Sequence, residues 1–544
     1  LLPSDMVATL RGALGTLFFA SNIVFWRGMA GGYFAATDAA LNPLLHTWSL
    51  AVEEQFYVFF PILLLLCYRH ARRHIVWVLI ACAAVSLGSA ALLVKNKSVA
   101  AFFLSPFRAW ELLAGALLAF NAVPLLRSRI VRELTAGAGL AAIVAACFLY
   151  DAKTIFPGLT ALVPVLGAAA IIHAGASGSS FVGKLLQLRP MVYVGLISYS
   201  LYLWHWPLMV LVRYAIGMEP LTSWIPLLFI VSLLLGSLSY HFIEQPFRRD
   251  ARFGPNFVFT SSLAFASVLA LVSFVGLVRD GFETRFGAEV VKLDKARTPA
   301  IPFRDCDSRP QESWCKLGAS SATPSLLIWG DSHALAWAPA IDAMLQSANQ
   351  QAMFAPSSQC PPLLGINNDF KPVCGQQNDV VKKYLLIHPE IKTVVMAGYW
   401  SSYFNENFPL SVTTGAKGTA AAKKGLADTL QWLRDNNRHA ILIGPVPVYD
   451  KSVPLALALG SATNRNLLQS TTELEQRARN SPFYEVVSAV QPSSRFRFLD
   501  PIEWMCSGEC VTMRAGDPLY RDANHLSLAG AKAMQDKLAI GLGI

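Results

Sequence analysis

The sequence predicts a polytopic α-helical membrane bundle followed by an α/β domain with a parallel sheet. Three observations support this prediction. The chain of 544 residues is 54% hydrophobic and only 15% charged, which is too apolar for a single soluble domain. Its long apolar stretches lie in residues 1–278, whereas residues 279–544 have a mixed composition. In that second half, short apolar runs alternate with helical stretches, which is the pattern of a parallel α/β sheet.

Nine stretches in the first half approach the roughly 20 apolar residues that a helix needs to cross a bilayer. They are approximately 8–26, 50–68, 75–95, 101–122, 133–150, 157–175, 191–213, 223–242 and 256–278. The first stretch is also compatible with a partial or re-entrant span.

Basic residues are distributed unevenly between these stretches. Clusters follow the second, fourth, sixth and eighth stretches: Arg69, Arg72 and Arg73; Arg127, Arg129 and Arg132; Lys184 and Arg189; Arg248, Arg249 and Arg252. Because positive loops remain in the cytoplasm, the alternate loops and everything after about residue 279 are predicted to lie outside it. The first 278 residues contain 18 Lys and Arg against 10 Asp and Glu, so most of the net charge of +10 belongs to the membrane half. That charge therefore does not indicate nucleic acid as a partner, and no recognition motif supports one.

Several ionisable or polar side chains lie within the apolar stretches, where each is costly unless it is paired. They include His46, Glu53, Glu54, Arg108, Glu111, Tyr202, His205 and Glu244. Arg108 and Glu111 are three residues apart and so share one helix face. Singly, each has a structural explanation, such as a neutralising Arg–Glu pair or an aromatic anchor at the membrane interface. As a set, they predict a polar cavity within the bundle.

Six of the nine cysteines lie in the second half, as three pairs of near neighbours. The pairs are Cys306 and Cys315, Cys360 and Cys374, and Cys506 and Cys510. An even number of cysteines outside the cytoplasm predicts disulfides, in agreement with the orientation derived from the loops. Sequence does not determine their connectivity, so pairing of neighbours is one possibility. A zinc site is the alternative, but no Cys-x-x-Cys pair or histidine-rich partner accompanies these residues, and no metal is expected.

The second half contains four predicted strands, at 325–330, 393–400, 440–449 and 496–500. Predicted helices lie at 334–348, around 419–436 and at 526–540. In parallel α/β folds, reactive groups gather at the carboxyl ends of the strands.

The segment GDSH (330–333) follows the first of these strands. Gly330 allows a tight turn, and the following helix directs its amides toward an oxyanion near Ser332. Near the other end of the domain, Asp522 and His525 supply an acid and a base for a Ser–His–Asp triad. Each motif alone has a simpler explanation, because Gly-Asp-Ser is common in loops and Asp-x-x-His before a helix can be an N-cap. Their placement after a first strand and before a last helix favours catalysis.

The segments GDSH and DANHLS resemble the motifs of the SGNH (GDSL-type) hydrolase fold, a three-layer α/β domain. The segments HTWSLAVEEQFY, RAWELLAG, YSLYLWHWP and FIEQPFR resemble the acyltransferase-3 membrane family. Their combination resembles bacterial O-acetyltransferases that modify surface polysaccharides such as lipopolysaccharide O-antigen. The resemblance implies a relay that takes acetyl from cytoplasmic acetyl-CoA and delivers it to a hydroxyl of an envelope polysaccharide or lipid-linked glycan. It also implies a multi-pass protein in the lipids of the bacterial inner membrane, with its C-terminal domain in the periplasm and no bound cofactor.

The resemblance assigns Ser332 as the nucleophile, His525 as the base and Asp522 as its orienter, with an acyl-serine intermediate. It also places the eight polar residues of the membrane half on motif positions, without individual roles. Two features depart from the families. The first membrane helix, with its Arg and essential His, is not found, and we expect the chain to be a fragment. The Asn of a Gly-x-Asn block is also missing, because residues 398–401 read GYWS. The oxyanion hole is therefore left to backbone amides, of which Ser332 and Gly398 are the candidates.

These observations predict an acyltransferase-3-like membrane domain (1–278), a linker (279–302) and a periplasmic SGNH-like domain (303–544). Two other functions fit part of the pattern. A membrane-anchored glycan acetyl esterase would share the triad but would not need polar groups inside the bundle. A transporter or flippase with an extracytoplasmic sugar-binding domain would use the polar groups but not the triad.

Overall fold

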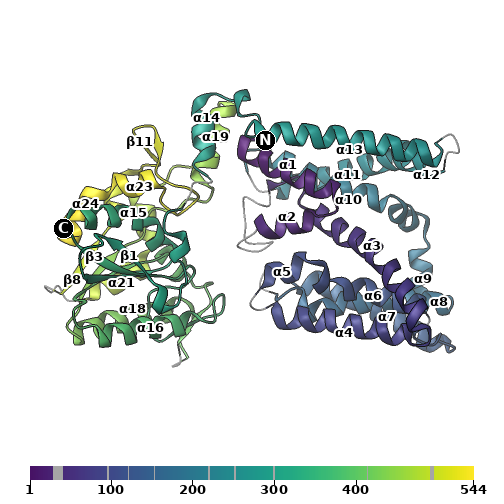
Figure 1. The fold of residues 1–544 in the computed structure, drawn as a ribbon, viewed down its shortest axis with the longest axis horizontal. Helices are drawn as coiled ribbons and strands as arrows, with labels where there is room; N and C mark the ends of the chain where they lie inside the picture. The colour runs from purple at the N-terminus through teal and green to yellow at the C-terminus, as the bar shows by residue number, and fades with distance from the viewer. Residues whose placement is uncertain are drawn as a thin grey trace. The chain divides into compact units, whose positions relative to one another are not determined.

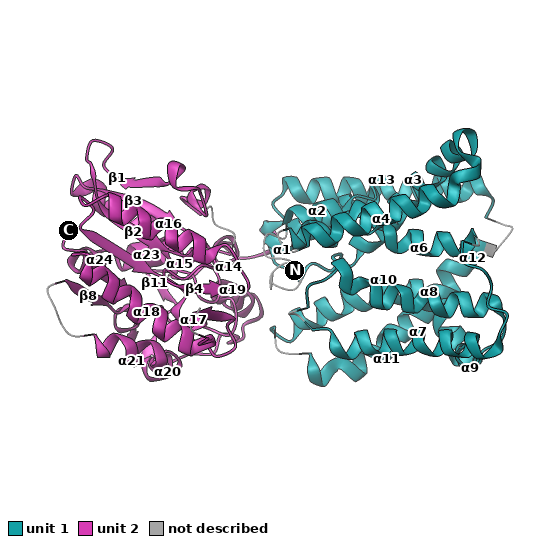
Figure 2. Cartoon of the chain, turned by 90° about the horizontal axis from the view of Figure 1, so that it is seen from below, with its two compact units in different colours: residues 1–283 teal, residues 284–544 magenta. Residues whose placement is uncertain are grey.

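The computed structural model describes residues 1–28, 41–94, 97–120, 122–151, 154–218, 221–249, 253–297, 301–412, 415–490 and 495–544. Arg252 and residues 298–300 of the predicted linker lie outside the described residues. The chain divides into two compact units, residues 1–283 (unit 1) and 284–544 (unit 2), shown in teal and magenta in Figure 2.

Unit 1 consists of α-helices (Figure 1). Within the described residues, seven helical segments are long and apolar enough to cross a membrane: Thr47–His70, Arg72–Leu93, Arg129–Leu149, Gly158–Ser177, Arg189–Ala215, Thr222–Arg248 and Pro255–Val278. The main α-helices of these segments are α3 (Thr47–His70), α4 (Ile75–Leu93), α7 (Arg129–Leu149), α8 (Leu162–Ser177), α10 (Arg189–Ala215), α11 (Ile225–Ser239) and α13 (Pro255–Val278). They correspond to seven of the nine stretches predicted from composition.

The other two predicted stretches, 8–26 and 101–122, are not continuous helices. For 8–26 the sequence also allowed a partial or re-entrant span, whereas the continuous helix predicted at 101–122 was wrong. The first is divided into α1 (Pro3–Leu17) and α2 (Ser21–Gly28), because Phe19 has a positive φ of 52°. The second is divided into α5 (Ser98–Phe103) and α6 (Ala109–Ala119). Leu104 between them is extended, and the proline at position 106 starts a short 3₁₀ turn instead of continuing the helix.

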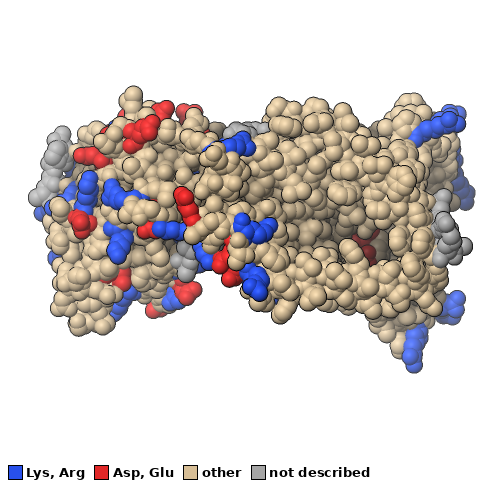
Figure 3. Space-filling view, turned by 90° about the horizontal axis from the view of Figure 1, so that it is seen from above, with Lys and Arg blue, Asp and Glu red and all other residues tan. Residues whose placement is uncertain are grey.

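The surface of unit 1 exposes so many large apolar side chains that its contact with water would be unfavourable. Phe148, Leu92 and Phe242 are 84%, 80% and 75% exposed, and many other large apolar side chains of this unit point outward. Figure 3 shows a broad band of this unit without charged side chains. Exposed apolar surface on this scale marks contact with lipid, so unit 1 is a multi-span membrane domain.

Unit 2 is built on a six-stranded sheet with the order β1-β3-β2-β5-β7-β8. The strands are β1 (Cys315–Gly318), β2 (Pro324–Gly330), β3 (Gln351–Pro356), β5 (Thr393–Ala397), β7 (His439–Ile443) and β8 (Phe496–Leu499). All neighbours pair in parallel except β1 with β3. The register aligns Gly330, Ala397, Ile443 and Leu499 in one row, so the segments after four strands leave the same edge.

Helices cover both faces of this sheet (Figure 1). One face packs a core with α15 (Ser332–Ser347), α23 (Leu528–Ala533) and α24 (Gln535–Leu542). The other face packs a core with α16 (Cys374–Ile387), α18 (Gly418–Asp435) and α21 (Ser481–Ala489). The predicted α/β fold with a mainly parallel sheet is therefore confirmed, as three layers.

Some predicted boundaries in unit 2 were wrong. The strand predicted at 440–449 ends at Ile443, because Pro445 and Pro447 cannot donate to a sheet ladder. The strand predicted at 393–400 ends at Ala397, and the helix predicted at 526–540 is interrupted at Met534. Strands β1 and β3 were not predicted at all.

The junction between the two halves contains a helix that belongs to unit 2. Helix α14 (Ala288–Lys295), within the predicted linker, packs against α19 (Val453–Thr463). Unit 2 also carries three disulfides, which join cysteines that are neighbours in sequence: Cys306–Cys315, Cys360–Cys374 and Cys506–Cys510.

Candidate active site

Ser332 occupies the first position of α15, two residues after the end of β2. The turn before it depends on Gly330, because a Cβ at this position would lie 1.9 Å from the carbonyl oxygen of Ala397 on β5. Only glycine permits this approach of two neighbouring strands. The strand and the glycine together place the serine hydroxyl at the carboxyl edge of the sheet.

Asp331 is fully buried beneath the serine and braces the turn. Its Oδ1 accepts a hydrogen bond from the amide of His333 at 2.7 Å. Its Oδ2 accepts one from the amide of Tyr399 at 2.8 Å and one from the hydroxyl of Tyr403 at 2.5 Å. Burial raises the pKa of Asp331, and these three hydrogen bonds oppose the shift. The carboxyl group thereby ties the start of α15 to the segment after β5.

His525 lies beside the serine, although the two are 193 positions apart. Its Nε2 is 2.7 Å from Ser332 Oγ, and its Nδ1 is 2.7 Å from Asp522 Oδ2. The other carboxylate oxygen, Asp522 Oδ1, accepts hydrogen bonds from the backbone amides of Asn524 and His525 at 2.9 and 2.7 Å. The side chain of Asp522 therefore both shapes the turn and orients the imidazole.

The turn that carries His525 is held by the segment after β7. The amide of Tyr449 donates to the carbonyl of Ala523 at 2.9 Å, and the amide of Val453 donates to the carbonyl of Asp522 at 3.1 Å. The base is therefore positioned by the same edge of the sheet as the serine, although it follows the last strand in sequence.

Asp522 is set up to remain ionised. Burial by itself raises the pKa of this carboxyl, but hydrogen bonds from His525 and from two backbone amides outweigh burial and hold the pKa well below its usual range. The guanidinium of Arg521 lies 3.9 Å from Asp522 Oδ2 and adds positive charge. An ionised carboxylate is the partner that a protonated imidazole requires during proton transfer.

Backbone amides near the serine determine what can stabilise an oxyanion. The amide of Ser332 lies in the first turn of α15, where helical amides have no acceptor within the helix. Gly398 directly follows β5, next to the serine turn. The amide of Tyr399 is engaged by Asp331, so it is not free for this purpose. The amides of Ser332 and Gly398 thus stay the candidate donors.

Sequence reasoning overlooked the residues that surround the triad. Asp331 and His333 are part of the GDSH segment but had no assigned role. Tyr399 lies in the GYWS segment (398–401) directly after β5, and Tyr403 follows two residues after that segment. The signal was their placement directly after two neighbouring parallel strands, where site residues are expected.

In the membrane unit, three of the predicted polar residues lie together. The ring of His46 is 5.3 Å from that of Tyr202 and 5.7 Å from that of His205. The hydroxyl of Tyr202 lies 2.7 Å from the carbonyl of His46 and 2.5 Å from the hydroxyl of Ser49. This group joins the start of α3 to the middle of α10.

Arg108 and Glu111 form a second group. Their side chains are ion-paired at 2.9 Å. The guanidinium also lies over the rings of Trp48, Phe102 and Phe156, at 5.4, 5.5 and 5.6 Å. An ion pair and an aromatic cage together lower the cost of a charge inside an apolar bundle.

The acidic residues further along α3 and in the π-helical turn Tyr240–Glu244 after α11 form separate interactions. Glu53 accepts a hydrogen bond from Tyr57, and Glu54 is half-buried on the same helix. Glu244 accepts hydrogen bonds from Ser200 at 3.0 Å and from Arg248 at 2.9 Å. The structure therefore distributes the eight predicted polar residues over several groups.

The two interrupted helices of unit 1 are tied to each other by a polar cluster of Asn22, Gln55 and Ser105. Gln55 Nε2 donates to the carbonyl of Phe19 in the first interruption at 2.7 Å and to Asn22 Oδ1 at 3.0 Å. Asn22 Nδ2 donates to the carbonyl of Phe103 before the second interruption at 3.1 Å, and Ser105 donates to Gln55 Oε1. Side chains here satisfy backbone groups that the broken helices release within the membrane.

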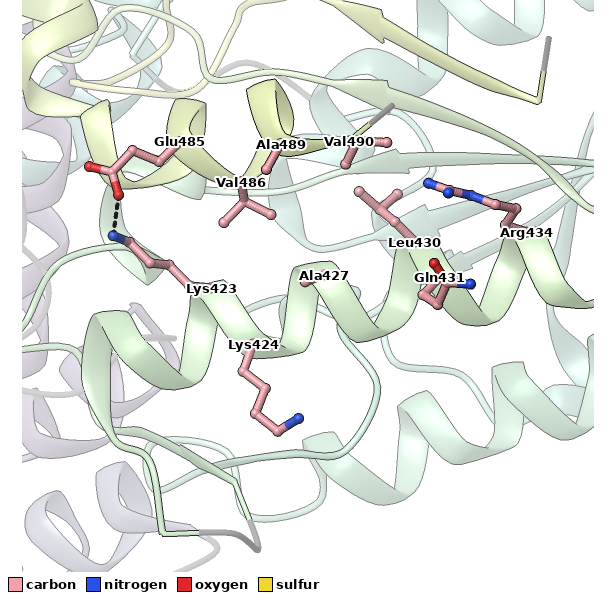
Figure 4. Close-up of a pocket in the computed structure, with 10 residues that line it drawn as sticks. All are labelled: Lys423, Lys424, Ala427, Leu430, Gln431, Arg434, Glu485, Val486, Ala489 and Val490. Atoms are coloured by element: carbon pink, nitrogen blue, oxygen red, sulfur yellow. Dashed lines mark hydrogen bonds and ion pairs between the residues drawn. The ribbon is translucent and has the colours of Figure 1, made fainter. Parts of the chain in front are cut away.

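No group of three or more His, Cys, Asp or Glu side chains suited to a metal ion occurs in the part of the chain that the structure describes. A groove between α18 and α21 is spanned by an ion pair between Lys423 and Glu485 at 2.5 Å (Figure 4). None of the triad residues lines this groove.

Comparison with known proteins matches both halves of the chain. Residues 303–539 match the family described as the SGNH domain fused to AT3 domains, and residues 11–241 match the acyltransferase domain family. O-acetyltransferase OatA of Staphylococcus aureus is 30% identical over 261 residues, which are 45% of this chain and 42% of that protein. The putative peptidoglycan O-acetyltransferase YrhL of Bacillus subtilis is 32% identical over 275 residues, which are 46% of this chain and 41% of that protein. The chain thus spans less than half the length of these curated relatives.

One solved structure is also similar, that of the periplasmic domain of a lipopolysaccharide acetyltransferase from Salmonella ser. Paratyphi A. It is 15% identical, with a TM-score of 0.33, and the match covers 48% of this chain and 99% of that chain.

Proposed function

This chain joins an acyltransferase membrane domain to an SGNH domain of the kind fused to such domains, and from this premise we propose that it O-acetylates an envelope polysaccharide. The observation that carries the proposal is the Ser332–His525–Asp522 chain, in which two contacts of 2.7 Å connect a nucleophile, a base and an orienting carboxylate. The two relatives bear the names O-acetyltransferase and putative peptidoglycan O-acetyltransferase, and these names support the same class of reaction.

The geometry supports a two-step transfer. Ser332 Oγ attacks the acetyl carbonyl while its proton moves to His525 Nε2, and collapse of the tetrahedral intermediate returns that proton to the leaving group. A sugar hydroxyl then attacks the acetyl-serine ester and gives its proton to His525. As the ester bond to Ser332 breaks, His525 returns this proton to Ser332 Oγ, which restores the free enzyme. Asp522 stabilises the imidazolium in both steps, and the amides of Ser332 and Gly398 stabilise the oxyanion.

The proposed donor is acetyl-CoA on the cytoplasmic side, with the SGNH domain in the periplasm of a bacterial inner membrane. Three disulfides in unit 2 support this orientation. The basic loops support it as well when the interrupted pair α5 and α6 counts as one crossing of the membrane, because the basic clusters then lie on one side of the spans. The buried polar groups of unit 1 support passage of the acetyl group through the bundle, because such groups in a membrane usually mark a pathway.

The test uses membranes that contain the full chain, labelled acetyl-CoA and an envelope polysaccharide fraction. We expect label in the polysaccharide with the wild-type chain and none with Ser332→Ala. Persistent labelling with Ser332→Ala contradicts the serine relay. Removal of acetyl groups from the polysaccharide, without their addition, identifies a membrane-anchored acetyl esterase instead.

A further inference from the structure

The imidazole of His333 lies in the active site but has no part in the triad. This residue follows the nucleophile on the first turn of α15 and is only 4% exposed. Its backbone amide is bound to Asp331, which holds the residue at a defined position. A buried polar ring next to a catalytic residue requires a physical reason, because an apolar side chain would fill the space at lower desolvation cost.

The ring of His333 is in contact with two other rings. It stacks on Tyr399 with 4.8 Å between centroids and 21° between planes. Its centroid also lies 4.6 Å from that of His525, with 32° between the two planes. Tyr399 and His525 are themselves 6.5 Å apart, so His333 contacts both more closely than they contact each other.

We propose that His333 is a positioning residue, whose flat ring holds the imidazole of His525 in line between Ser332 and Asp522. The proposal rests on the proposed function, in which His525 accepts the proton of Ser332. No bond forms to His333, and the proton moves only between Ser332 Oγ and His525 Nε2.

A positioning ring is needed because hydrogen bonds alone leave the imidazole of His525 free to tilt. Its Nδ1 is held by Asp522 Oδ2 and its Nε2 lies against Ser332 Oγ, but these two contacts still permit the ring to rotate about the line that joins the two nitrogens. The ring of His333 restricts this rotation, since aromatic rings in contact favour particular relative orientations. Tyr399 stacks on His333 in turn, so the three rings form one cluster that is tied to the segment after β5.

The charges around the stack favour a neutral His333. The charged and titratable groups that face the two histidine rings are Asp522, Arg521, Asp331 and Tyr399. Burial, followed by the proximity of His525, lowers the pKa of His333 well below its usual range. His333 therefore does not compete for the proton of Ser332, and His525 alone has a carboxylate partner at hydrogen-bonding distance.

The test measures how readily Ser332 reacts with a fluorophosphonate probe in the full chain in detergent. This reaction needs the serine–histidine pair but neither acetyl-CoA nor a glycan. The maximal inactivation rate and the half-saturating probe concentration are measured for His333→Phe, which keeps a flat ring, and His333→Leu, which does not. Ser332→Ala identifies the labelled residue. His388→Leu is the matched control, because it removes a histidine of the same unit that precedes β5, at the opposite edge of the sheet.

We expect His333→Leu to lower the maximal rate by about three- to tenfold, the scale of one aromatic contact, with little change in the half-saturating concentration. His333→Phe should stay within about twofold of the wild type, and His388→Leu should equal it. Melting curves of each variant show whether the chain remains folded.

Three outcomes overturn the proposal. If His333→Leu reacts at the wild-type rate while Ser332 is labelled, the stack has no positioning role and the proposed function stands. If folded His333→Phe loses as much rate as folded His333→Leu, the nitrogens and not the ring face are needed. If the wild-type chain is not labelled at Ser332, the nucleophile of the proposed function fails together with this inference.

Discussion

Unit 2 brings Ser332 and His525 together across 193 positions of sequence, whereas unit 1 leaves its predicted polar residues in several separate groups. In unit 2, water surrounds the fold, so apolar packing of both sheet faces fixes the strands, and the strand ends then define one site. In unit 1, lipid surrounds the bundle, and polar side chains first have to neutralise each other or the ends of broken helices. A buried histidine or carboxylate in unit 2 therefore points to a catalytic site, whereas in unit 1 it can serve simply to pair another polar group within the membrane.

The largest expected effect separates the two units by function. His46→Ala in unit 1 should abolish acetyl transfer to polysaccharide but leave labelling of Ser332 by a fluorophosphonate intact. His525→Ala in unit 2 should abolish both, because the serine then lacks its base. Acetyl transfer in membranes and probe labelling of the same preparation check this. Full acetyl transfer by His46→Ala would show that the cluster of unit 1 is structural.

The disulfide between Cys360 and Cys374 should contribute strongly to the stability of unit 2, whereas the cysteines of unit 1 are free. Replacing both cysteines by alanine removes a cross-link over 14 positions and should lower the unfolding free energy of unit 2 by about 3 kcal/mol. Thermal unfolding with and without a reductant measures the effect. Cys147→Ala, at an exposed position of unit 1, is the control and should change nothing. If the wild-type chain unfolds at the same temperature with and without a reductant, the disulfide does not contribute to the stability of unit 2.

Acid should destabilise unit 2 through His333. The folded state keeps this residue neutral, whereas the unfolded chain binds a proton below about pH 6.5, so stability falls as the pH falls. The expected loss is at most about 1.4 kcal/mol per pH unit below that point. Apparent melting temperatures at pH 7.5 and pH 5.5 should therefore differ more for the wild type than for His333→Phe. Equal differences would show that His333 is protonated in the folded chain.

The smallest expected effect is at the polar cluster of Asn22, Gln55 and Ser105, which connects the interrupted helices of unit 1. Gln55→Leu removes its hydrogen bonds to Phe19 and Asn22 and should destabilise unit 1 by roughly 0.6–2 kcal/mol, because polar contacts in membranes are individually modest. Thermal unfolding in detergent compares it with Gln187→Leu at the exposed end of α9 (Phe181–Leu186). If the two variants melt alike, the tie does not contribute to stability.

Composition and periodicity were sufficient for much of the fold. Seven of the nine apolar stretches are spanning helices, since length and hydropathy alone determine which segments suit a bilayer. The failures at 8–26 and 101–122 have a local cause, a positive φ at Phe19 and a proline at position 106, and composition averages over such positions. Strand β3 was missed because its sequence QAMFAP contains a Gln and a Pro and no β-branched residue, so its composition does not favour a strand.

By itself, the sequence determined the two-part architecture, the chemistry of the candidate triad and the presence of six cysteines in the second half as neighbours in sequence. These depend on residue type and on local spacing, which the chain carries without folding. Tertiary structure alone decided the bracing of the serine turn by Asp331, the ring stack of Tyr399, His333 and His525, and the tie between the interrupted helices. Such contacts join segments that are distant in sequence, and they arise only when the register of the sheet and the packing of the bundle bring those segments together.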